Sequence, residues 1–153
     1  MTKEVIDKAI ELLKRNVDGN AIDILFYGGE PLLNFDMLGY TVEKVEQSGI
    51  NAFFSIITNG SIMTDTMAEF IKKHHIQITV SLDGNKETND KLRIDNNGNG
   101  TYEKVVSTIK KLKEHDILPG ISCTLSSHNQ CDAGSIIPVL EKFGIRSFGY
   151  NLP

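Results

Sequence analysis

Cysteine is scarce in this 153-residue sequence, which contains only Cys123 and Cys131. Small secreted domains that depend on a framework of several disulfides are therefore excluded. Two thiols are also too few for an iron–sulfur cluster, which is usually held by four cysteines. A zinc site would need further ligands such as His128, and the paired spacing typical of zinc ligands is missing. The residues therefore predict no metal site, and they single out no catalytic residue.

The sequence also lacks long apolar runs and an excess of positive charge. No run approaches the ~20 apolar residues that span a bilayer, so we expect no membrane partner. Lys and Arg number 16 against 20 Asp and Glu, a net charge of −4, which argues against a nucleic-acid partner. The N-terminal residues form an amphipathic helical pattern rather than a signal peptide. Together these features predict a cytoplasmic protein with one globular domain.

What the sequence does have is a regular alternation of helical and strand patterns. Apolar segments predict strands at about 21–27, 52–57, 76–82, 120–125 and 146–150. Helical patterns separate them, at about 35–48, after Thr64, at 86–92, after Thr101 and at 135–143, and Thr64 and Thr101 are the expected N-caps of their helices. Strands that are joined by single helices should be parallel, with right-handed crossovers. This order fits both a doubly wound α/β sheet and a (β/α) barrel.

Small polar residues and glycines come directly after the predicted strands. These segments are 28–31, 58–60, 81–84, 126–129 and Asn151. In both architectures, ligands bind at the carboxyl-terminal ends of the strands. The chemically useful groups should therefore meet at one rim of the sheet.

Gly28-Gly29-Glu30-Pro31 is the most informative of these segments. A glycine pair lets the backbone turn sharply and come close to a ligand. An ammonium group needs several oxygen acceptors, which the Glu30 carboxylate and exposed carbonyls could supply. The alternative is an ordinary strand-to-helix turn with a surface glutamate, and the tetrapeptide alone does not decide between the two.

Four motifs in order resemble the radical S-adenosylmethionine enzymes. They are Tyr27-Gly28-Gly29-Glu30-Pro31-Leu32-Leu33, Thr58-Asn59-Gly60, Ser81-Leu82-Asp83-Gly84 and Asn89-Asp90-Lys91-Leu92-Arg93. Within that family the chain is most similar to anaerobic sulfatase-maturating enzymes and SPASM-type peptide maturases. The resemblance covers nearly the whole chain. It implies an α/β fold, a partial barrel of parallel strands, in which residues 1–153 form one domain of about five βα units.

The resemblance also implies a binding site for S-adenosylmethionine. The turn of Gly28, Gly29, Glu30 and Pro31 would bind its methionyl amine, with Thr58 and Asn59 beside the cofactor. Ser81 would hydrogen-bond to its ribose or carboxylate, and Asp83 of the same motif joins the cofactor-binding set. Arg93 is the best partner for the carboxylate because its guanidinium can bind bidentately. The alternative for Arg93 is a surface ion pair with Asp90 or Asp95.

The chain departs from the family pattern in two ways. Asn89 stands where the family usually has histidine. The Cys-x3-Cys-x2-Cys motif, whose thiolates hold a [4Fe–4S] cluster in the family, is absent from residues 1–153. We therefore expect an inner fragment of an enzyme that modifies a peptide or protein, without the strand that bears the cluster motif and without the C-terminal region. We expect it to be inactive alone and to self-associate through its edge strands, 21–27 and 146–150.

The pattern has two alternative interpretations. The same barrel could serve as a peptide- or nucleotide-binding scaffold without redox chemistry. A doubly wound, receiver-like nucleotide-binding domain is disfavoured because no acidic cluster closes the first strand and no Gly-x-Gly-x-x-Gly turn is present.

Overall fold

Five parallel strands form one sheet in chain order in the computed structural model, which describes residues 2–152. The strands are β1 (Ile22–Phe26), β2 (Ala52–Thr58), β3 (Gln77–Ser81), β4 (Gly120–Thr124) and β5 (Phe148–Asn151). Each strand pairs in parallel with the next one along the chain. A doubly wound sheet would reverse its strand order at a switch point. The sequential order therefore identifies part of a (β/α) barrel wall, as the motifs implied.

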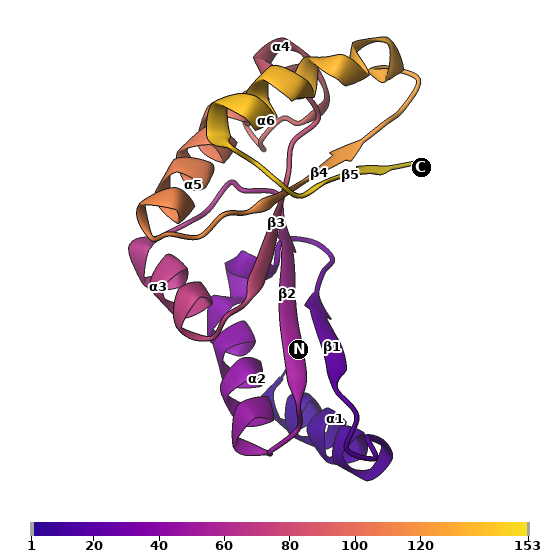
Figure 1. Cartoon of the computed structure of the whole chain (residues 1–153), viewed down its shortest axis with the longest axis vertical. Coiled ribbons are helices and arrows are strands. Elements are labelled where there is room, and N and C mark those ends of the chain that lie inside the picture. Colours follow the sequence, from indigo (N-terminus) through magenta and orange to yellow (C-terminus); the bar gives the residue numbers. More distant parts are fainter. Residues whose placement is uncertain (1, 153) are drawn as a thin grey trace.

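The helices follow one side of this wall. They are α1 (Lys3–Asn16), α2 (Phe35–Gln47), α3 (Asp65–Lys73), α4 (Lys86–Leu92), α5 (Tyr102–Glu114) and α6 (Ile137–Phe143), with 3-10 helices η1 (Pro31–Asn34) and η2 (Gln130–Ile136). In Figure 1, α2, α3, α5 and α6 lie in an arc along one side of the strands. Among residues 2–152, none of the helices combines the length and the apolar character that a membrane span requires.

Burial alternates along the strands, which shows that the helices cover one face of the sheet. On β2, Phe54 and Ile56 are buried, whereas the side chain of Phe53 is 61% exposed. On β1, Leu25 is 51% exposed and pairs in register with Ser55 of β2. The open face would be the lumen side of a closed barrel. Side chains that point to this face and lie near the strand ends are therefore free to line a site.

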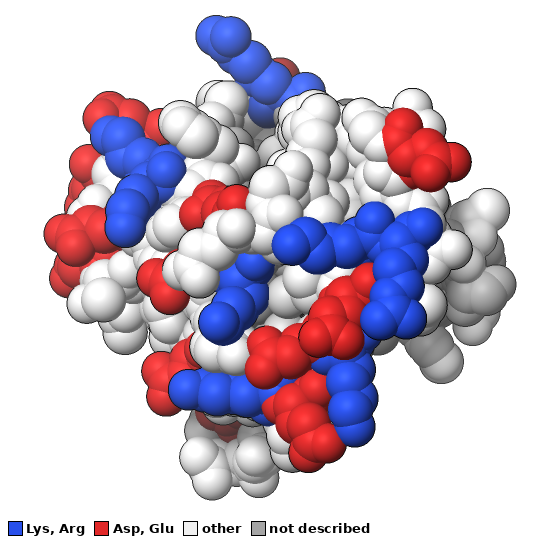
Figure 2. Space-filling view, turned by 90° about the horizontal axis from the view of Figure 1, so that it is seen from below, with Lys and Arg blue, Asp and Glu red and all other residues white. Residues whose placement is uncertain are grey.

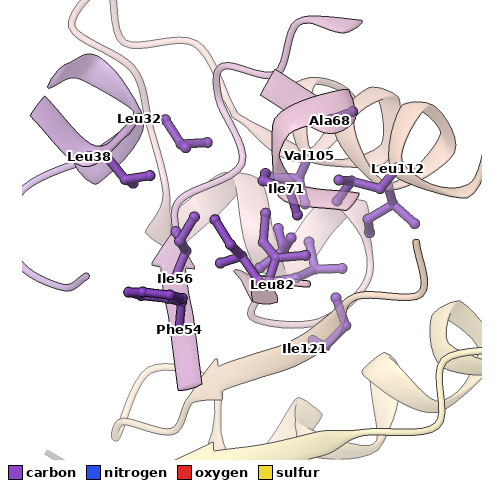
Figure 3. Close-up of a cluster of buried hydrophobic side chains, with 14 of the residues drawn as sticks. Leu32, Leu38, Phe54, Ile56, Ala68, Ile71, Leu82, Val105, Leu112 and Ile121 are labelled. Carbon is purple, nitrogen blue, oxygen red and sulfur yellow. The ribbon is translucent and has the colours of Figure 1, made fainter. Parts of the chain in front are cut away.

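The core fills the space between the covered face and the helices. Figure 3 shows Ile56 of β2, Leu82 after β3 and Ile121 of β4 in one buried cluster with Val105 and Leu112 of α5. These side chains are all at most 2% exposed. This packing fixes where the strands end, and so fixes the positions of the loops that follow them.

The predicted elements agree with the structure except at several ends. Thr64 caps α3 as predicted, because its Oγ1 accepts a hydrogen bond from the amide of Met67. Thr101 does not cap α5; the carboxylate of Asp90 accepts the hydrogen bond from the Tyr102 amide instead. The predicted helix at 135–143 begins as the 3-10 helix η2, and its α-helical part is limited to α6 with a proline in its first turn.

Candidate functional site

The carboxyl-terminal ends of the strands surround a cavity of about 300 Å³. Six of the predicted site residues line it: Gly28, Gly29, Thr58, Asn59, Ser81 and Arg93. The other three, Glu30, Pro31 and Asp83, do not. A larger cavity of about 580 Å³ lies at the opposite, amino-terminal ends of β3 and β4 and contains none of the predicted residues. The strand ends therefore bring most of the predicted set together, in the place where this architecture binds ligands.

The glycine pair gives the cavity a wall made of backbone. Gly28 has φ +94° and Gly29 has φ +48°, a region that favours glycine. A Cβ atom at either position would meet nothing within 4 Å. The turn therefore needs glycine for its backbone conformation, and it leaves open space on the side where a side chain would stand.

Glu30 connects the glycine turn to the end of β2 by hydrogen bonds. Its Oε1 accepts a hydrogen bond from Thr58 Oγ1 at 2.7 Å, and its Oε2 accepts one from the Asn59 amide at 2.7 Å. Oε1 also accepts the Leu32 amide at 3.1 Å, which starts η1. The sequence suggested this carboxylate as an acceptor for an ammonium group. In the structure it holds two cavity-lining residues in place.

Arg93 forms a bidentate ion pair with Asp83, the residue that follows Leu82 at the end of β3. Arg93 Nε donates to Asp83 Oδ2 at 2.6 Å, and Nη2 donates to Oδ1 at 3.1 Å. The surface partners considered from the sequence were wrong: Asp90 pairs with Lys86, and Asp95 pairs with Lys104. Arg93 lines the cavity with a side chain that is 25% exposed, and its ion pair with the buried Asp83 holds the guanidinium at the site.

Asn89, the position at which the family usually has histidine, is fully buried. Its Oδ1 accepts a hydrogen bond from the Asp83 amide at 3.2 Å, and its carbonyl accepts one from the Arg93 amide at 2.7 Å. Asparagine therefore links the Asp83 loop to the end of α4, and the motif from Asn89 to Arg93 serves to place Arg93.

The sequence assigned no site role to four further residues that line the cavity, which are Tyr27, Ile57, Ser122 and Thr124. Asn151, which was placed on the rim, lines it too and donates a hydrogen bond from Nδ2 to Ser122 Oγ at 2.7 Å. The sheet register explains this grouping, because Ser81 pairs with Ser122 and Thr124 pairs with Asn151. His128 was also placed on the rim, but it is not among the residues that line the cavity.

A groove of about 630 Å³ adjoins this cavity and shares Asn59 and Arg93 with it. Apolar side chains form part of its wall, among them Leu33 and Ile94, which are 73% and 60% exposed. Asp95 and Lys104 lie at its border. The site therefore combines a polar cavity at the strand ends with a more apolar groove beside it.

Asp95 closes the loop that borders the groove. Its Oδ1 accepts hydrogen bonds from the amides of Asn97 and Asn99, both at 2.9 Å, and its Oδ2 pairs with Lys104 at 2.8 Å. The loop also has a bridge between Ile94 and Gly100. The carboxylate therefore organises the whole turn.

We predict that Asp95 titrates well below an ordinary aspartate. The hydrogen bond from Lys104, followed by those from the Asn99 and Asn97 amides, lowers the pKa of Asp95 to about 2. A carboxyl whose pKa falls on folding stabilises the loop above its unfolded pKa of about 3.9 and loses that effect as pH falls through about 2. Carbon-detected NMR titration of the Asp95 carboxyl should show this, and Lys104→Met should raise the value. A titration midpoint near 4 in the unaltered chain would contradict the assignment.

Charge on the surface is mixed. On the face shown in Figure 2, Lys and Arg side chains lie among Asp and Glu side chains rather than in a stripe of one sign. This face therefore offers no continuous basic surface to a polyanion.

The two cysteines do not fit an iron–sulfur cluster. Cys123 is buried in β4, where burial raises the pKa of its thiol to about 11, while a metal ligand must be a thiolate. Cys131 is exposed and lies in η2. Within residues 2–152, no group of three His, Cys, Asp or Glu side chains could hold a metal ion. The cluster that the family motif holds has no ligand set in this part of the chain.

Comparison with known proteins places the chain in a family. The model described as "Radical SAM superfamily" matches residues 1–128. The cysteine-type anaerobic sulfatase-maturating enzyme of Clostridium novyi (strain NT) is 37% identical over 112 residues, which are 67% of this chain and 30% of that protein. The uncharacterised protein MJ0907 of Methanocaldococcus jannaschii is 33% identical over 139 residues, covering 90% of this chain and 48% of that protein.

A solved structure shows the same fold. Native anSMEcpe with bound AdoMet and Cp18Cys peptide superposes with a TM-score of 0.90 at 21% identity, covering 98% of this chain and 43% of that one. The chain thus spans less than half the length of these relatives. Because the family model matches most of its residues and the barrel wall carries the motifs at the expected strand ends, the chain belongs to the radical SAM superfamily.

Proposed function

We propose that this chain is the S-adenosylmethionine-binding part of a radical enzyme that modifies a peptide or a protein. The observation that carries the proposal is the cavity at the strand ends, where Gly28, Gly29, Ser81 and Arg93 meet. The similar proteins support the substrate class, because they include sulfatase-maturating enzymes and a structure with bound AdoMet and peptide. Cytoplasmic residence stays a prediction.

The cavity offers groups for each end of the cofactor. The exposed carbonyls of the glycine turn suit the methionyl ammonium, and the Ser81 hydroxyl suits the ribose or the carboxylate. The Arg93 guanidinium suits the carboxylate because charge-assisted hydrogen bonds to a fixed fork are strong. S-adenosylmethionine supplies the family's radical chemistry when it is bound next to a reduced [4Fe–4S] cluster. Residues 1–153 supply no ligand set for that cluster, so we assign no reaction step to them.

Calorimetric titration of the chain with S-adenosylmethionine tests the proposal. We expect weak, saturable binding, because the cluster iron that would also hold the amine and carboxylate is not provided by these residues. Ser81→Ala should weaken it, and Ser147→Ala, at the opposite end of the sheet, should not. No saturable binding, or equal effects of the two variants, would overturn the assignment. Three cysteines spaced Cys-x3-Cys-x2-Cys and encoded upstream in the same frame would support the enzyme over a scaffold.

We also propose that the 153-residue chain self-associates. Within the described residues, β1 pairs only with β2 and β5 pairs only with β4, so each leaves one edge open. The uncovered face of the sheet exposes Leu25 and Phe53. Open edges and exposed apolar surface favour pairing with another chain.

Sedimentation should therefore show a mass above 17.0 kDa that rises with concentration. Phe53→Asp should reduce the association, whereas Val5→Asp, at an exposed apolar position on α1, should not. A single 17.0 kDa species at every concentration would contradict the proposal.

A further inference from the structure

We infer that Asp83 is a positioning residue that fixes the Arg93 guanidinium at the cofactor cavity and does not itself touch the cofactor. The inference rests on the proposed function. Asp83 is 6% exposed and is not among the residues that line the cavity, whereas Arg93 lines both the cavity and the adjoining groove. The sequence motif had suggested a direct contact between Asp83 and the cofactor.

Both oxygens of Asp83 are already engaged by the protein. Oδ2 accepts from Arg93 Nε at 2.6 Å, while Oδ1 accepts from Arg93 Nη2 at 3.1 Å and from the Thr124 amide at 2.8 Å. The carboxylate therefore joins the end of β3 to the end of β4 and to the residue that follows α4. A ligand could reach Asp83 only by displacing these charge-assisted hydrogen bonds, which are the strong ones in proteins.

The backbone on each side of the pair is also fixed. The Arg93 amide donates to the Asn89 carbonyl at 2.7 Å, and the Arg93 carbonyl accepts from the Thr101 amide and hydroxyl, both at 3.1 Å. Asn89 in turn holds the Asp83 amide. The guanidinium is therefore held both by the fixed backbone of Arg93 and by its two hydrogen bonds to Asp83. Little side-chain freedom is left for Arg93 to lose when a ligand binds.

The ion pair with Asp83 leaves one nitrogen of the Arg93 guanidinium, Nη1, for a ligand. Nε and Nη2 face Asp83, and Nη1 has no hydrogen bond to any residue between 2 and 152. A guanidinium held by a buried carboxylate keeps its orientation and can still donate from Nη1 to a second carboxylate. Asp83 should therefore matter for ligands that carry a carboxylate and not for those that lack one.

Two thioethers separate these cases, because S-adenosylhomocysteine carries the aminocarboxylate group and 5′-methylthioadenosine lacks it. For the 153-residue chain, Asp83→Asn should weaken S-adenosylhomocysteine about tenfold, the loss expected when one hydrogen bond between charged groups is misplaced. Binding of 5′-methylthioadenosine should stay within about twofold. The control Asp116→Asn removes a charge that pairs with Lys72 at the opposite ends of the strands and should change neither ligand's affinity. Equal weakening of both ligands by Asp83→Asn, or no weakening of either, would overturn the inference.

A ligand-free measurement keeps the inference separate from the proposed function. The Nε–H signal of Arg93 should exchange slowly with water in the unaltered chain and rapidly in Asp83→Asn, with the thermal midpoint recording whether the variant is folded. If neither thioether binds the unaltered chain, the proposed function fails. Slow exchange of the Arg93 Nε–H that Asp83→Asn abolishes would still support Asp83 as the residue that positions Arg93. Rapid exchange in the unaltered chain would overturn that role.

Discussion

Gly60→Ala should lower the free energy of unfolding by about 2–4 kcal/mol, the sum of a left-handed backbone penalty and core overpacking. Gly60 follows β2 with φ +69°. A Cβ atom there would lie 2.8 Å from Val80 Cγ1 and 3.3 Å from Val105 Cγ2. Both valines are fully buried, so neither can move aside without disturbing the core. The glycine of the Thr58-Asn59-Gly60 motif is therefore needed for packing, apart from any role in binding.

Urea unfolding of Gly60→Ala and Gly98→Ala measures this effect. Gly98 has a similar φ of +79°, but a Cβ atom there would meet nothing within 4 Å. The Gly98 variant should lose only the backbone penalty of about 1–2 kcal/mol. Equal losses at the two positions would show that packing against the valines contributes nothing.

Glu30→Ala should lower the affinity for S-adenosylmethionine at least about tenfold, because hydrogen bonds to charged groups contribute about 1.5–3 kcal/mol each. The substitution removes the acceptor that holds Thr58 Oγ1 and the Asn59 amide at the cavity. It also removes the acceptor for the Leu32 amide at the start of η1. Both the shape of the glycine turn and the position of its neighbours should therefore change.

Calorimetry on Glu30→Ala and on Glu69→Ala, an exposed glutamate on α3, separates this effect from loss of charge alone. We expect the Glu69 variant to bind like the unaltered chain. Binding in the micromolar range that Glu30→Ala leaves unchanged would contradict the assignment of the site.

The helices and strands could be predicted because their patterns are local. The α4 helix, expected at 86–92, spans Lys86–Leu92, and the Asn85 side chain caps it by accepting the Thr88 amide. The order of elements could not distinguish a barrel from a doubly wound sheet. That distinction depends on which strands pair and on which face the helices cover, and both are long-range properties.

The partners of the charged residues were predicted less well. Asp90 and Asp95 are close to Arg93 in sequence, yet Arg93 pairs with Asp83, ten positions earlier. The α4 helix between Asp83 and Arg93 brings the two residues together. No local sequence pattern predicts that contact. Thr101 failed as a helix cap for a related reason, because the more distant Asp90 reaches the Tyr102 amide. Contacts that depend on tertiary packing were the ones that sequence patterns could not supply.

The most direct test of the proposed site is an NMR titration of the isotopically labelled chain with S-adenosylmethionine, followed amide by amide. If the cavity at the carboxyl-terminal strand ends is the cofactor site, the saturable shifts should fall on Gly28, Gly29, Asn59, Ser81 and Thr124. Shifts that gather instead on Gln77, Thr79 and Gly120, around the larger cavity at the opposite strand ends, would contradict it, as would a titration without saturable shifts.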